Sequence, residues 1–65
     1  MTRAELIARL LEVRAESQRS VDLCRSLEGV GDAAANRRMQ TRFERHVETL
    51  SETIAMLQRD SEVAA

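Results

Sequence analysis

The sequence predicts an all-α fold, an antiparallel two-helix hairpin with coiled-coil-like packing. Two long segments repeat apolar residues at alternating spacings of three and four, there is no proline, and both glycines lie together near the middle of the chain. Such spacing places apolar side chains on one face of a helix, and clustered glycines mark a reversal of the chain. We expect a single domain with helices over 3–28 and 33–60, a turn at 29–32 and a tail at 61–65.

The first predicted helix begins with a capping box. In the segment TRAE at 2–5, the Thr2 hydroxyl is placed to accept a hydrogen bond from the Glu5 amide while the Glu5 side chain reaches back. The seam predicted to face the second helix then runs through Leu6, Leu10, Val13, Ser17, Ser20, Cys24 and Leu27. Serines on such a seam leave room for bulky neighbours, so we expect them to be small packing residues.

The turn and the second helix follow from Gly29 and Asp32. Gly29 is expected to end the first helix because glycine adopts the left-handed conformation without strain, and Val30 then folds back toward Cys24. Asp32 offers a carboxylate to cap the second helix. A connection this short makes the helices antiparallel. The seam of the second helix is predicted to contain Phe43, Val47, Leu50, Ile54 and Leu57.

The first half of the first helix has more apolar surface than one partner helix can cover. Leu6 and Leu10 are predicted to point at the second helix, whereas Ile7 and Leu11 form a neighbouring stripe that Val21 extends. Exposed patches of this kind mark interfaces, and a chain of this length has a marginal core on its own. We therefore expect a protein partner, a second copy or another chain, to complete a helical bundle at these five residues. The alternative is that long arginine stems half-cover them.

The composition argues against an enzyme and against a metal or cofactor site. The one cysteine, Cys24, cannot form an intrachain disulfide and suits a reducing compartment. The hairpin register separates it from the one histidine, His46, by roughly 10 Å of helical rise. We expect Cys24 to be a small buried apolar residue and His46 to lie at the edge of the core. The glycine pair lacks the strand and spacing of a phosphate-binding loop.

The charge of the chain is balanced, with ten arginines, eleven acidic residues and a net charge of −1. This balance leaves no global field to attract nucleic acid or a membrane surface. No apolar run approaches the roughly 20 residues that cross a bilayer. The N-terminal segment has acidic residues inside its apolar stretch, unlike a signal peptide, so we expect a cytoplasmic protein.

Three arginines support an alternative function. Arg38, Arg42 and Arg45 fall on one outward face of the second predicted helix. A homodimeric four-helix bundle with such a stripe is able to bind nucleic acid, and the small RNA-binding hairpin dimers of plasmid copy-number control have a similar length and layout. An acidic protein is able to use the same stripe. The simpler interpretation is a solvated face with arginine–glutamate pairs.

Two segments resemble a known family of helical hairpins. GVGDAA at 29–34 and ETLSETIAML at 48–57 are similar to the E-type co-chaperones of bacterial type III secretion needle subunits. The family pattern at the end of the second helix corresponds to Leu50, Ile54, Ala55, Met56 and Leu57. The resemblance implies a role without catalysis. The hairpin would bind a larger helical-repeat chaperone, and the pair would keep an aggregation-prone needle subunit monomeric in the cytoplasm until export.

Overall fold

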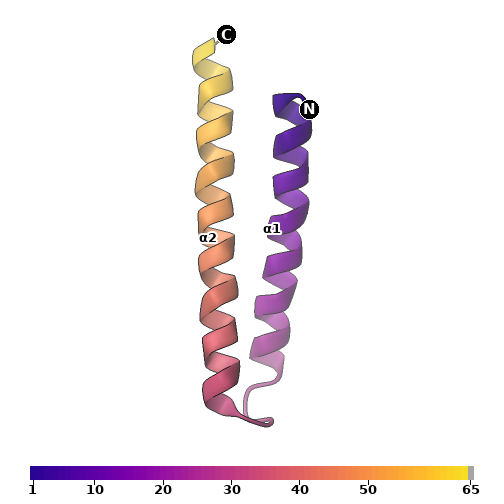
Figure 1. Cartoon of the computed structure of the whole chain (residues 1–65), viewed down its shortest axis with the longest axis vertical. Coiled ribbons are helices and arrows are strands. Elements are labelled where there is room, and N and C mark those ends of the chain that lie inside the picture. Colours follow the sequence, from indigo (N-terminus) through magenta and orange to yellow (C-terminus); the bar gives the residue numbers. More distant parts are fainter. Residues whose placement is uncertain (65) are drawn as a thin grey trace.

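The protein is an antiparallel helical hairpin. The computed structural model describes the backbone of residues 1–64 and the side chains of residues 1–60. Helix α1 runs over Arg3–Ser26 and helix α2 over Ala33–Ala64, and the two lie side by side (Figure 1). The molecule is a rod of 51 × 15 × 14 Å. The predicted all-α hairpin is therefore confirmed. In the described part of the chain, neither helix is long and apolar enough to cross a membrane.

Both helices end at places that differ from the prediction. Helix α1 ends at Ser26, two residues early, so the connection covers residues 27–32. The sequence leaves residues 61–65 open between a helix end and a disordered tail; helix α2 continues to Ala64, beyond the predicted end at 60, and Ala65 lies outside the described residues. No glycine or proline follows Asp60, so nothing in the local sequence breaks the helix there.

The start of α1 is capped as predicted, with a different second bond. The Glu5 amide donates to the Thr2 hydroxyl oxygen at 3.1 Å. The Thr2 hydroxyl in turn donates to the Glu5 carboxylate at 3.0 Å, whereas the Glu5 side chain of a capping box accepts from the backbone N–H of the cap residue. Both arrangements bring the carboxylate to the positive end of the helix dipole, where a negative charge is favourable.

The connection reverses the chain through a tight turn. The Val30 amide donates to the Leu27 carbonyl at 3.0 Å, and Gly29 has φ +83°, while Glu28 between them has a negative φ. This is the pattern of a type II turn, whose third residue needs the positive φ that glycine adopts freely. Val30 is 64% exposed, so the contact predicted with Cys24 is wrong.

Two side chains after the turn hold the adjoining helix ends. The Asp32 carboxylate accepts from the amides of Ala34 and Ala35 at 3.0 and 3.1 Å, which confirms it as the cap of α2. The Asn36 side-chain amide donates to the Cys24 carbonyl at 2.9 Å. The same carbonyl also accepts from the Leu27 amide at 3.3 Å, at the end of α1. Carbonyls in the last turn of a helix have few donors within it, and Asn36 supplies a second one from the opposite helix.

The core is one narrow line of side chains between the helices. Ser17, Val21 and Cys24 of α1 and Ile54 of α2 are buried, and Val21 is the most covered at 1% exposed. Half-buried residues extend this line toward the open end of the hairpin and along α2, namely Ile7, Leu10, Arg14, Phe43, Val47, Leu50 and Leu57. The seam predicted for α2 is therefore confirmed.

The seam predicted for α1 is only partly correct. Leu10, Ser17 and Cys24 do face α2, but the exposed residues include Leu6, Val13 and Leu27, at 38%, 39% and 42%. Helix α1 is rotated so that the neighbouring line of residues, Ile7, Arg14 and Val21, faces α2 in their place.

Arg14 is compatible with this rotation because its charge stays at the edge of the contact. Its guanidinium donates to the Ser51 hydroxyl at 3.3 Å, so the aliphatic stem lies along the contact while the head reaches a polar partner. A purely apolar pattern search rejects an arginine at that place and selects Val13 instead.

We expect Val21→Ala to lower the free energy of unfolding by about 2 kcal/mol, because it leaves a cavity in the most buried position of the contact. Leu23→Ala is the control, since Leu23 is 59% exposed, and we expect a change within about 0.5 kcal/mol. Urea denaturation followed by circular dichroism, at one fixed chain concentration, measures both. Equal losses in the two variants would contradict the observed rotation of α1.

We expect Asn36→Ala to cost about 1 kcal/mol, because it leaves the part-buried Cys24 carbonyl without its side-chain donor. Gln58→Ala, at an exposed helical position, serves as the control for the change to alanine. Amide hydrogen exchange should show faster exchange in the last turn of α1 in Asn36→Ala alone. Unchanged exchange there would show that the bond does not stabilise the helix end.

Candidate protein-interaction surface

One long side of the hairpin is polar and bonded across the two helices. The Arg25 guanidinium pairs with the Glu44 carboxylate at 3.3 Å, and Gln40 donates to the same carboxylate oxygen at 3.1 Å. The bond from Arg14 to Ser51 lies on this side too. Successive residues of a helix are about 100° apart, and these positions all flank the α1–α2 contact in the same direction. We call this the polar side, defined by Arg14, Gln18, Arg25, Gln40, Glu44 and Ser51.

The opposite long side carries exposed apolar residues on α1, and on α2 it has the exposed Met39 together with leucines that are half-buried against α1. Leu6 and Val13 are seven residues apart, as are Leu50 and Leu57, so each pair lies along one line of its helix. Leu27 continues the first line beyond Ser20, and Met39, 52% exposed, lies on this side of α2 nearer the turn, where His46, Thr53 and Asp60 follow it at seven-residue intervals. We call this the apolar side, defined by Leu6, Val13, Leu27, Met39, Leu50 and Leu57. It runs nearly the length of the hairpin and crosses from one helix to the other.

The five predicted partner-binding residues do not lie on one surface. Leu6 belongs to the apolar side, whereas Leu11, equally exposed at 38%, lies on the polar side. Ile7 and Leu10 are half-buried against α2. Val21 is buried between the helices, so its placement on an outward stripe is wrong, because the rotation of α1 turns it inward. Partner binding at the remaining four residues stays a prediction.

Sequence reasoning missed most of the apolar side. The spacing places Val13, Leu27, Leu50 and Leu57 in the seams between the two helices, and it places Met39 one turn before Phe43, where the seam of the second helix is expected to shift. Leu50 and Leu57 are seven residues apart and Val13 and Leu27 fourteen, and spacing in multiples of seven is typical of helices that pack along their length. Which members of that wide apolar stripe stay outside depends on the rotation of α1, which the spacing leaves open.

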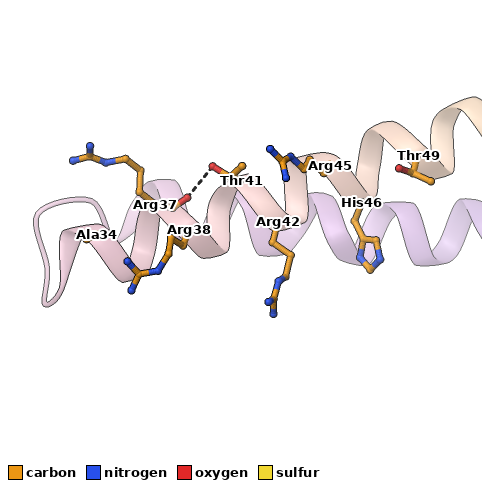
Figure 2. A pocket seen from close by; sticks show the side chains of 8 residues that line it. All are labelled: Ala34, Arg37, Arg38, Thr41, Arg42, Arg45, His46 and Thr49. Carbon is orange, nitrogen blue, oxygen red and sulfur yellow. Dashed lines mark hydrogen bonds between the residues drawn. The ribbon is translucent and has the colours of Figure 1, made fainter.

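The predicted arginines lie on the outer face of α2, on a shallow groove of about 680 Å³. Figure 2 shows the guanidiniums of Arg37 and Arg45 on one side of the helix and those of Arg38 and Arg42 on the other. Because they do not converge, they suit an extended anionic chain better than a single phosphate. The groove is lined by Ala34, Arg37, Arg38, Thr41, Arg42, Arg45, His46 and Thr49.

Cys24 and His46 occupy different environments. Cys24 is a buried free thiol in the contact between the helices, as expected of a small apolar residue. His46 is exposed and borders the arginine groove. Among the described residues there is no group of three or more potential metal ligands.

Comparison of the chain with protein-family models, curated proteins and solved structures gives no match. The resemblance to the needle-subunit co-chaperones therefore depends on GVGDAA and ETLSETIAML alone. The first of these segments includes Gly29, Asp32 and the first two residues of α2, and the second lies within α2.

Proposed function

We propose that this chain is a non-enzymatic protein–protein interaction module that supplies one layer of a helical bundle. The observation that carries the proposal is the apolar side, where leucine and valine side chains of α1 and Met39 of α2 are exposed beside the half-buried Leu50 and Leu57. Contiguous exposed apolar surface on a small protein usually marks an interface. The polar side, in contrast, has its charged groups bonded within the hairpin.

The apolar side has the form of a helix-packing surface. Leu6 and Val13 on α1, and Leu50 and Leu57 on α2, are each seven residues apart, which is the repeat that lets helices of another protein pack at a shallow angle. A partner of this kind would present an amphipathic helix or a helical groove. The few buried residues of the hairpin also favour assembly, because a narrow core gains much of its stability from further burial.

The resemblance to needle-subunit co-chaperones suggests a specific form of this function. In that form the hairpin works in the bacterial cytoplasm, binds a helical-repeat chaperone, and helps to keep an export subunit monomeric. Support comes from the two quoted segments and from the apolar side, which offers the surface that such a complex requires.

We expect Leu6→Asp to weaken partner binding by about tenfold or more, since a carboxylate would replace an apolar contact within the interface. Leu11→Asp is a closely matched control, because Leu11 is the same residue type, is equally exposed and lies on the polar side. The chain is co-expressed with the proteins encoded beside its gene, and co-purification is quantified together with the helicity of each variant.

The two variants separate the structural interpretation from the one based on sequence. Loss of binding in Leu6→Asp alone supports the apolar side as the interface. Loss in both variants supports the predicted set of Leu6, Ile7, Leu10 and Leu11. Full binding in both would contradict the proposed function.

The arginine groove favours a second candidate function, a homodimeric regulator that binds nucleic acid. Arg38, Arg42 and Arg45 border a groove on the outer face of α2, and Arg38 and Arg42 also line a surface hollow with Met39 of the apolar side. The first half of α2, residues 33–46, carries four arginines and one glutamate, a local net charge of +3. An acidic protein segment would be attracted to the same groove.

Salt dependence tests this second function. Each phosphate contacted by an arginine makes the negative slope of log affinity against log salt steeper by about 0.9. If the groove binds nucleic acid, Arg42→Ala should make that slope shallower by about one unit. Fluorescence anisotropy with a labelled DNA duplex and a labelled RNA duplex measures it, and Arg59→Ala, outside the groove, is the control. Equal slopes for the two variants, or no binding of either duplex, would exclude nucleic acid binding by the groove.

A further inference from the structure

We propose that the apolar side is covered by a second copy of this chain, with the turns of the two hairpins at opposite ends of a four-helix bundle. The inference rests on the proposed function, because it names an occupant for the same surface. It draws on the exposed area of the chain, on the distribution of charge along the two helices, and on the position of the apolar residues relative to the middle of the hairpin.

The exposed area of the chain matches the requirement of such a dimer. The chain exposes 5071 Å². A folded globular protein of 7.3 kDa exposes about 4,200 Å². The excess of about 900 Å² is close to the roughly 800 Å² that each partner contributes to a stable interface. Covering the apolar side with one hairpin of equal length would therefore restore the burial expected of a globular protein.

The charges on α2 favour opposite ends for the two turns. Residues 33–46 of α2 have a net charge of +3. Residues 47–60 contain Glu48, Glu52 and Asp60 against Arg59, a net charge of −2. If the turns lie at opposite ends, the two copies of α2 run antiparallel beside each other. With the two-fold axis near Leu50, Arg42 of each α2 lies close to the level of Asp60 of the other, and complementary charge of this kind favours one orientation over its alternatives.

Helix α1 has no comparable separation of positive and negative charge along its length. Its nine charged residues alternate strictly in sign from Arg3 to Arg25, so neither half carries a large net charge. If both turns lay at the same end, each α2 would be next to the other copy's α1, and its two charged halves would meet mixed charge. Antiparallel contact of α1 with its own copy is free of this mismatch, since an alternating pattern offers opposite charges at many registers.

The apolar side has residues at the place where a two-fold axis would cross it. The bond from Arg14 to Ser51 puts Val13 and Leu50, the residue before each, at nearly the same level near the middle of the hairpin. In an antiparallel arrangement these two residues would lie close to their own copies. In that register Leu6 would lie opposite Ser20 of the second α1, so the apolar contact is centred on Val13 and Leu50.

The mass of the chain in solution is the first test. Sedimentation equilibrium over a wide concentration series should give twice the 7.3 kDa of one chain. Leu6→Asp and Val13→Asp should each raise the dissociation constant by about thirtyfold or more, and Leu11→Asp should leave it unchanged. A wild-type chain that stays monomeric would overturn the proposal. A dimer that tolerates both Leu6→Asp and Val13→Asp would also overturn it, because the apolar side would not be the contact.

The orientation of the two copies is tested with spin labels in the turn. Val30→Cys is labelled under native conditions, where Val30 is exposed and Cys24 is buried. Turns at opposite ends should place the two labels roughly one hairpin length apart, and the longest dimension of the hairpin is 51 Å. Labels separated by only the width of a bundle would overturn the opposite-end arrangement.

These measurements also separate this inference from the proposed function. If the chain is a monomer and Leu6→Asp alone loses a protein partner, the dimer proposal is wrong and the interaction-module proposal holds. If Leu6→Asp breaks a dimer but leaves co-purification unchanged, the dimer proposal holds and the apolar side is not the surface that binds another protein.

Discussion

A single line of contact between α1 and α2 determines most properties of this protein. Two helices have only one surface in common, so a hairpin buries one narrow row of side chains and no more. Here that row is centred on Val21, Cys24 and Ile54, with the small Ser17 letting the helices approach. Apolar residues that do not belong to this row, or to the half-buried residues that extend it, stay exposed to solvent. The wide apolar stripe of α1 is therefore divided between an inner contact and an exposed surface.

Three polar interactions accompany the division of the apolar residues of α1 into buried and exposed ones. The Asn36 amide joins α2 to the last turn of α1 through the Cys24 carbonyl, and the Arg14 guanidinium reaches Ser51 near the middle of the hairpin. The ion pair of Arg25 with Glu44 lies on the same side as the second of these. Each interaction is modest, and the ion pair is exposed. Together they accompany a rotation of α1 that turns Val21 inward and leaves Val13 outside.

The result is a hairpin with two unlike sides, and this asymmetry has consequences for function. On the polar side the charged groups satisfy one another, so a partner there would have to displace existing bonds or accept desolvation of charges. On the apolar side a partner would cover exposed leucine, valine and methionine side chains without breaking a bond between the helices. Any occupant of the apolar side excludes the others. A second copy and a different protein would compete for it, so self-association would set the concentration of chains free to bind elsewhere.

How far the sequence predicts this protein depends on the range of the interactions involved. Local signals were sufficient for the two helices, for Thr2 and Asp32 as caps, for the glycine turn and for the seam of α2, because each depends on residues within a few positions of one another. They were not sufficient for the end of α1, where Asn36 acts from another helix, or for the candidate interaction surface. For α1, Leu6 to Leu27 and Ile7 to Val21 are both possible seams, since they share Leu10, Ser17 and Cys24 and have the same spacing.

The sequence by itself determined an all-α hairpin and a surplus of apolar residues on α1. Only the tertiary structure decided which of those residues stay exposed and which are buried against α2. Helical periodicity gives the width of an apolar stripe, but the rotation of a helix against its neighbour depends on contacts between residues far apart in the chain. Burial of Val21 and the reach of Arg14 to Ser51 select one rotation, and the apolar side is what that rotation leaves exposed.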